Sequence, residues 1–76
     1  MTNRIKDLIK TLPEAVQHQI EEYRQEYTFH KEEYNNSRYN RLTEVRQRMA
    51  GYALGLRDAG LITERDRQYI FVYMTV

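Results

Sequence analysis

Cysteine is absent from this 76-residue chain, and the residues that interrupt helices are scarce, with one proline and three glycines. Without cysteine the chain can form neither disulfides nor zinc sites with thiolate ligands. A domain of this length buries only about 60% of the surface that its unfolded chain exposes, so its core is marginal. We therefore expect a single helical domain over residues 1–76 that depends on tight helix packing or on oligomerisation.

Long apolar segments are missing as well. No run approaches the roughly 20 apolar residues of a transmembrane helix, and the first residues lack the apolar core of a secretory signal peptide. Because the chain has no cysteine suited to an oxidising compartment, we expect a cytoplasmic protein without membrane contact. Neither sign of charge dominates, with 12 basic and 11 acidic residues. This balance excludes an acidic nucleic-acid mimic and a strongly basic chromatin-type binder.

Helix is the state that we expect nearly throughout, since so few residues interrupt it. Residues 2–10 predict a short first helix with an apolar face. Thr11 and Glu14 then form a capping-box pattern around Pro13, whose missing N–H costs little in a first helical turn. A second helix should therefore begin near Leu12.

The C-terminal part of the chain predicts a further helix. Gly60 follows a long periodic segment as a helix stop, and Thr63 with Asp66 forms a pattern typical of a helix cap. The last residues, 69–76, are apolar on every side and rich in strand-forming types. A lone strand would leave its backbone groups without partners, so we predict a helix whose apolar surface has to be covered.

Two long segments carry a heptad spacing, in which apolar or aromatic residues recur at alternating intervals of three and four. The first series consists of Val16, Ile20, Tyr23, Tyr27, His30 and Tyr34, and the second of Leu42, Val45, Met49, Tyr52, Leu56 and Ala59. Turn-forming residues at 35–37 separate them. This pattern predicts an all-α protein, a small helical bundle built on an antiparallel αα-hairpin with short N- and C-terminal helices. One unbroken helix over residues 12–59, about 70 Å long, is the alternative.

The aromatic residues of the first series are the main candidates for a binding site. Buried tyrosine hydroxyls and imidazoles need hydrogen-bond partners, so these residues form either a core whose polar tips reach the surface or a face for a partner. Tyrosine is enriched at protein interfaces, and Phe29 lies off the series among glutamates. The predicted partner-binding residues are Tyr23, Tyr27, Phe29, His30 and Tyr34.

Arginines after the expected turn indicate nucleic-acid binding as an alternative, because basic and aromatic side chains together can follow a phosphate backbone and stack on bases. The residues concerned are Arg38, Tyr39, Arg41, Arg46 and Arg48. Glu44 interrupts them, and they fall on opposite flanks of one helix. Arg57 also flanks the second series. We therefore favour ion pairs between these arginines and the glutamates that flank the first series, Glu22, Glu26 and Glu33.

Motifs for catalysis or for a cofactor are missing. Gly51, Gly55 and Gly60 lie within or at the end of a predicted helix and so do not form a phosphate-binding loop. His18 and His30 have no further carboxylate and histidine pair that would complete a metal site. We therefore expect no enzymatic activity, no cofactor and no metal. The GxxxG spacing of Gly51 and Gly55 predicts a close approach of another helix.

The segment from Gly51 to Tyr73, GYALGLRDAGLITERDRQYIFVY, resembles the C-terminal part of small uncharacterised proteins from phages and integrative elements of Gram-positive bacteria. The shared pattern is a helix end, the sequence GLITER and another helix. The resemblance implies no catalytic residue, but it implies a protein that binds a host or phage protein, as inhibitors of bacterial defence systems do. We therefore expect a homo-oligomeric protein-binding module, with an anti-CRISPR-like inhibitor as the specific hypothesis. A nucleic-acid-binding protein and a purely structural homo-oligomer are the alternatives.

Overall fold

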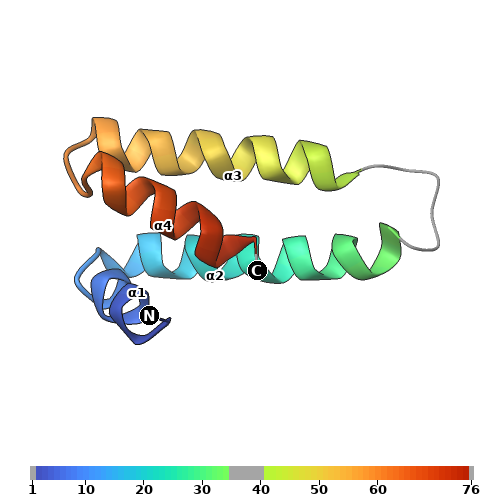
Figure 1. Cartoon of the computed structure of the whole chain (residues 1–76), viewed down its shortest axis with the longest axis horizontal. Helices are drawn as coiled ribbons and strands as arrows, with labels where there is room; N and C mark the ends of the chain where they lie inside the picture. The colour runs from blue at the N-terminus through green and yellow to red at the C-terminus, as the bar shows by residue number, and fades with distance from the viewer. Residues whose placement is uncertain (1, 35–40, 76) are drawn as a thin grey trace.

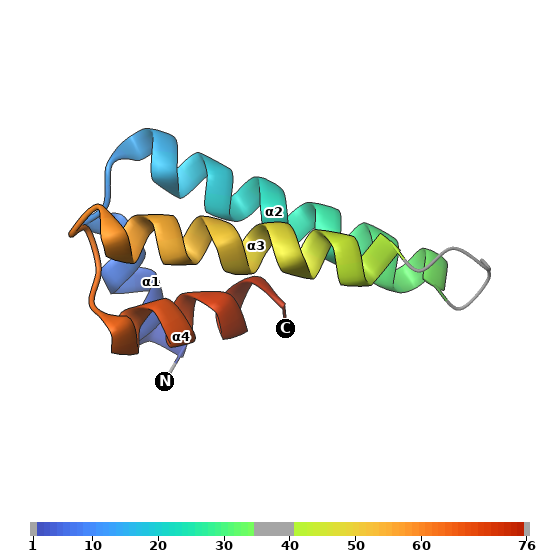
Figure 2. The ribbon, with the colours of Figure 1, turned by 90° about the horizontal axis from the view of Figure 1, so that it is seen from above.

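The computed structural model describes the backbone of residues 2–34 and 41–75 and the side chains of residues 4–32 and 42–75. Within these ranges the chain forms four helices: α1 (Thr2–Lys10), α2 (Glu14–Tyr34), α3 (Arg41–Asp58) and α4 (Glu64–Met74). The helices α2 and α3 lie side by side in opposite directions, α4 packs against both, and α1 lies at the start of α2 (Figure 1 and Figure 2). The predicted all-α bundle built on an antiparallel hairpin is confirmed.

Contacts between α2 and α3 define the register of the hairpin. The rings of Tyr23 and Tyr52 have centroids 5.4 Å apart, and Arg48 Nη2 lies 2.5 Å from Glu26 Oε1. The midpoint of each pair falls within residues 35–40, as an antiparallel pairing about that segment requires. The alternative of one unbroken helix is therefore wrong, and the predicted ion pairing between the helices is confirmed for Glu26 and Arg48. The predicted turn at 35–37 lies outside the described residues.

The end of α3 and the start of α4 follow the predicted signals. Gly60 has a φ of +79°, in the left-handed region that glycine adopts without steric cost. The N–H of Leu61 donates to the carbonyl of Leu56 over 3.0 Å, which completes a Schellman ending of α3. Thr63 caps α4, because its side-chain oxygen accepts a hydrogen bond of 3.1 Å from the backbone N–H of Asp66.

The start of α2 differs from the prediction. The Thr11 hydroxyl donates to the Leu8 carbonyl over 2.6 Å and therefore belongs to the end of α1. The helix α2 begins at Glu14, directly after Pro13. A residue that precedes proline is disfavoured in the helical region, so Leu12 cannot open the helix. It is instead buried in the core between the two helices.

The described members of both heptad series face the core, except at the end of the second series. Among the described side chains, the buried ones are Leu12, Ile20, Tyr27, Val45, Met49, Ala53, Leu56, Ile62, Ile70 and Met74. The helix α1 adds Leu8 and Ile9, which are partly buried against this cluster. The second series departs from its pattern at its end, where Ala59 is exposed and Ala53 is buried. Since α3 packs against both α2 and α4, its buried face is wider than that of a helix that packs against a single partner.

The helix α4 covers one part of the hairpin. Its Ile70 is fully buried. Arg24 of α2 contacts Tyr73, with Nη1 3.1 Å from the phenol oxygen and the guanidinium 4.3 Å from the ring centroid. Beyond the end of α4 the two hairpin helices continue together (Figure 1 and Figure 2). The chain itself thus covers one face of the apolar C-terminal segment, while Tyr69 and Val72 stay exposed. The homo-oligomer that we expected from this segment stays a prediction.

The glycines Gly51 and Gly55 lie on the exposed side of α3. A Cβ atom built at either position would meet no atom within 4 Å. No described helix therefore approaches α3 closely at these glycines. Within the described part of the chain, the close approach that we predicted from the GxxxG spacing is wrong.

Candidate functional site

Three of the predicted partner-binding residues point into the hairpin. Tyr27 belongs to the core with 9% of its surface exposed, and Tyr23 is half-buried against Tyr52 of α3. The His30 side chain is 14% exposed, and its Nε2 lies 4.0 Å from Glu26 Oε1. These positions agree with the core interpretation of the aromatic series and leave little of these side chains for a partner. Their part in partner binding stays a prediction, and the side chain of Tyr34 lies outside the described ones.

Phe29 is placed differently. Its side chain is 56% exposed, and with Val72 it is the most exposed large hydrophobic residue in the described part of the chain. The ring makes an edge contact with His30, with centroids 5.3 Å apart. The cause is helical periodicity: Phe29 follows the fully buried Ile20 by nine positions, which is two and a half turns and so the opposite side of the helix.

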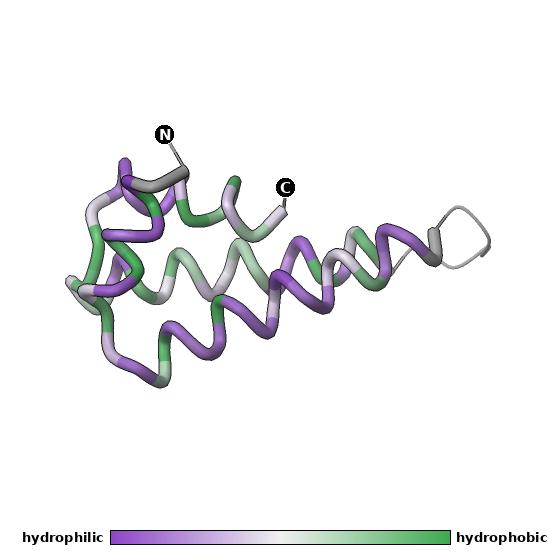
Figure 3. The backbone as a smooth tube through the Cα atoms, turned by 90° about the horizontal axis from the view of Figure 1, so that it is seen from below, coloured by the Kyte–Doolittle hydropathy of each residue, from purple (hydrophilic) through white to green (hydrophobic). Residues whose placement is uncertain are grey.

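Phe29 belongs to a continuous exposed face of α2, which we call the outer face. Its members recur at intervals of four and three, like the buried series, but on the other side of the helix: His18, Glu22, Gln25, Phe29 and Glu32. Figure 3 shows that hydrophilic residues recur on every turn of α2. The two basic residues of the helix, Arg24 and Lys31, share a different face, seven positions apart, and Arg24 points toward α4.

Some glutamates of α2 lie close to basic side chains, and others do not. Glu14 lies 3.7 Å from His18, and Glu21 lies 3.5 Å from Arg24. Glu26 binds Arg48, and this hydrogen bond raises the pKa of the arginine. In the part of the chain with described side chains, neither Glu22 nor Glu32 takes part in an ion pair. The outer face therefore presents an exposed phenyl ring between two unpaired carboxylates.

The predicted nucleic-acid-binding residues are not gathered into a basic stripe in the described part of the chain. Arg48 is engaged with Glu26 across the hairpin. Arg46 is exposed, but it lies two positions from Arg48 and so points to another side of α3. Arg38 and Tyr39, and the side chain of Arg41, lie outside the description. Nucleic-acid binding by these residues stays a prediction.

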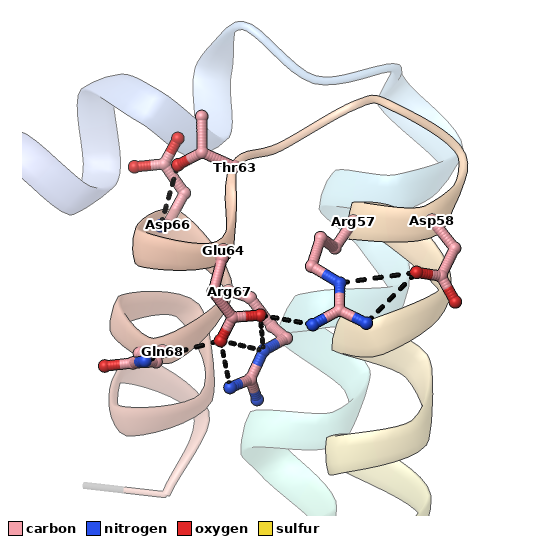
Figure 4. Close-up of polar contacts among 7 residues, drawn as sticks. All are labelled: Arg57, Asp58, Thr63, Glu64, Asp66, Arg67 and Gln68. Carbon is pink, nitrogen blue, oxygen red and sulfur yellow. Dashed lines mark hydrogen bonds and ion pairs between the residues drawn. The ribbon is translucent and has the colours of Figure 1, made fainter.

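A polar network that the sequence analysis missed joins α3 to α4. The carboxylate of Glu64 lies between the guanidinium groups of Arg57 and Arg67 (Figure 4). Arg67 Nε lies 2.8 Å and 2.9 Å from its two oxygens, and Arg57 also reaches Asp58 Oδ1 over 3.2 Å. We had expected Arg57 to pair with α2, but its side of α3 faces α4. These hydrogen bonds lower the pKa of Glu64 to about 2, with Arg67 contributing most.

Acid should weaken the protein through Glu64. Its pKa of about 2 in the folded chain lies below the ordinary value of 4.5, so the unfolded chain takes up a proton more readily. The contribution of Glu64 to the free energy of unfolding is therefore complete above about pH 5 and disappears as the pH falls from about 4.5 to about 2. In urea titrations we expect Glu64→Gln to have a lower midpoint than wild type at neutral pH and to converge with it near pH 2.

Glu22→Gln is the matched control, because Glu22 is an exposed helical glutamate outside any described ion pair. We expect its urea midpoint to follow that of the wild type across the same pH range. A difference between Glu64→Gln and wild type that is as large at pH 2 as at neutral pH would contradict the assignment.

Two other kinds of feature are absent from the described residues. They contain no group of three or more histidines and carboxylates that could hold a metal ion. Among the same residues, no helix is both long and apolar enough to cross a membrane. The outer face of α2 is the candidate site that we carry forward, because it holds the most exposed aromatic side chain of the described residues beside two exposed carboxylates.

Comparison of the chain with known proteins finds no matching family model, no matching curated protein and no matching solved structure. The resemblance of residues 51–73 to proteins of phages and integrative elements stays a prediction.

Proposed function

We propose that the protein is a non-enzymatic protein-binding module and that the outer face of α2 binds the partner, with Phe29 as its apolar anchor. The observation that carries this proposal is the 56% exposure of Phe29. Aromatic residues are enriched at protein interfaces and depleted from the remaining surface. Burying a phenylalanine side chain releases about 1.5–3 kcal/mol, which is enough for one residue to dominate a small interface.

The charges of the same face support a protein partner over a nucleic acid. Glu22 and Glu32 are exposed, and carboxylates repel the phosphates of a nucleic acid. Basic residues that could offset them lie on another face of α2 or are bound, as Arg24 is to Glu21 and Tyr73. A protein surface, in contrast, can supply both an apolar recess and cationic groups.

We further propose that this binding serves a phage or another mobile element in the bacterial cytoplasm by inhibiting a host defence protein, as an anti-CRISPR protein does. The support for this context is the resemblance of residues 51–73, which lie in α3, α4 and the connection between them. This resemblance does not involve the outer face of α2. The binding surface and the biological context are therefore tested separately.

Truncating Phe29 should weaken partner capture strongly. The tagged protein is incubated with lysate of a Gram-positive bacterium, and bound proteins are compared for wild type, Phe29→Ala and Val72→Ala. Val72 is the matched control because it is equally exposed, at 56%, but lies on α4. Loss of an interface anchor costs at least about 2 kcal/mol, so we expect the Kd of the captured partner to rise roughly 30-fold for Phe29→Ala. We expect Val72→Ala to bind like wild type.

Both substitutions remove exposed side chains, so neither should change the free energy of unfolding by more than about 0.5 kcal/mol. Circular dichroism melts verify this before binding is measured. A partner that Phe29→Ala retains at wild-type affinity would place the binding surface elsewhere. A partner lost from Val72→Ala alone would place it on α4.

A further inference from the structure

The arrangement of charge around Phe29 carries information about the partner. Of the exposed glutamates near this ring, Glu22 and Glu32 make no ion pair with any residue whose side chain is described. Glu26, three positions before Phe29, is already bound to Arg48, so it contributes little net charge to the face. Among the described side chains of the outer face, the negative charge therefore comes from two carboxylates, one on either side of the ring.

Helical geometry gives the spacing of these points. Glu22 and Glu32 are ten residues apart on one face, which places them about 15 Å apart along the axis. Phe29 lies between them, about 4.5 Å along the axis from Glu32 and about 10.5 Å from Glu22. The outer face as we have defined it contains no lysine or arginine, and its remaining members are Gln25 and His18.

We propose that the outer face of α2 binds a cationic protein surface, in which an apolar recess receives Phe29 and lysine or arginine groups about 15 Å apart receive Glu22 and Glu32. This inference rests on the proposed function and adds the chemistry of the partner. Electrostatic complementarity favours such a surface over a neutral or acidic one, because like charges brought together across an interface oppose binding. Burial of the ring supplies affinity, and the carboxylates supply orientation and a faster association.

A displayed library of small helical-bundle proteins, randomised on one face, tests this chemistry directly. The library is selected for binding to the full-length wild-type chain, and enriched clones are sequenced. We expect their randomised positions to carry more lysine and arginine than those of the unselected library. We also expect these clones to bind Phe29→Ala about 30-fold more weakly, as for an interface anchor.

A double variant separates charge from shape. Glu22→Gln combined with Glu32→Gln keeps the size of both side chains and removes their charges. Two exposed ion pairs account for about three- to tenfold in affinity, so we expect the enriched clones to lose that much at low salt and much less at high salt. Glu21→Gln is the matched control, because Glu21 is already paired with Arg24, and it should leave binding nearly unchanged.

The outcomes distinguish this inference from the proposed function. Clones that require Phe29 but are no more basic than the unselected library would overturn the inference and leave the proposed function standing. Basic clones that tolerate the loss of both Glu22 and Glu32 would also overturn it. Clones that bind Phe29→Ala as well as wild type, or a selection that enriches no clone, would contradict both.

Discussion

Removal of residues 69–76 should unfold the protein rather than shorten a tail. The segment contains Ile70 and Met74, both completely buried, and replacing one such side chain by alanine costs about 2–5 kcal/mol. A small domain has a total stability of about 5–15 kcal/mol, so the loss of the whole segment exceeds what the remaining three helices can spare. We expect the shortened chain to lose most of its helical circular dichroism and its cooperative melt.

Val72→Ala serves as the control for the truncation, because it removes an exposed side chain from the same segment. It should melt like wild type. Full helicity and a cooperative transition in the shortened chain would contradict this prediction. In that case the segment would have to face a partner, and the contacts of Ile70 and Met74 with the rest of the chain would contribute little.

Met49→Ala should have the largest effect among single substitutions in α3. Met49 is fully buried on the helix that packs against both α2 and α4, so its truncation leaves a cavity that the surrounding helices fill only in part. Such truncations of core methionines cost about 2–5 kcal/mol. Leu54→Ala, on the same helix but with a side chain that is 37% exposed, should cost less than about 1 kcal/mol.

Urea unfolding followed by circular dichroism measures both free energies on the same scale. The comparison tests whether α3 lies at the centre of the bundle with the orientation described. Equal losses for the two variants would mean that α3 is rotated about its axis. A larger loss for Leu54→Ala would exchange the buried and the exposed sides of the helix.

Features that depend on neighbouring residues along the chain were predictable from the sequence. The heptad series identified Ile20, Val45 and Met49 as core positions, and the cap at Thr63 and the stop at Gly60 were located to the residue. Each of these signals follows from helical periodicity or from local backbone preference. The predicted start of α2 was two residues too early, because Pro13 disfavours the helical conformation at the preceding Leu12.

Features that depend on how helices cross could not be predicted in the same way. The choice between a hairpin and one long helix was decided by contacts such as that of Tyr23 with Tyr52. The pairing of Arg57 with Glu64 requires α4 to fold back along α3, and no local pattern specifies that angle. The exposure of Phe29 was partly predictable, because its position off the heptad series is visible in the sequence. That Glu22 and Glu32 have no ion-pair partner among the described side chains became evident only from the structure.

Because α4 covers only part of the hairpin, the rate of native-state amide hydrogen exchange should differ along α2. Near Ile20, which is fully buried, the helix lies in a bundle, and we expect its amides to open only when the whole core is lost. Toward the C-terminal end of α2, beyond the end of α4 (Figure 1), α3 is the neighbour that holds it, so local opening there costs less than global unfolding. Phe29 lies toward this end. A partner that binds the ring would therefore also suppress the opening of the last turns of α2, and part of its binding free energy would appear as slowed amide exchange there.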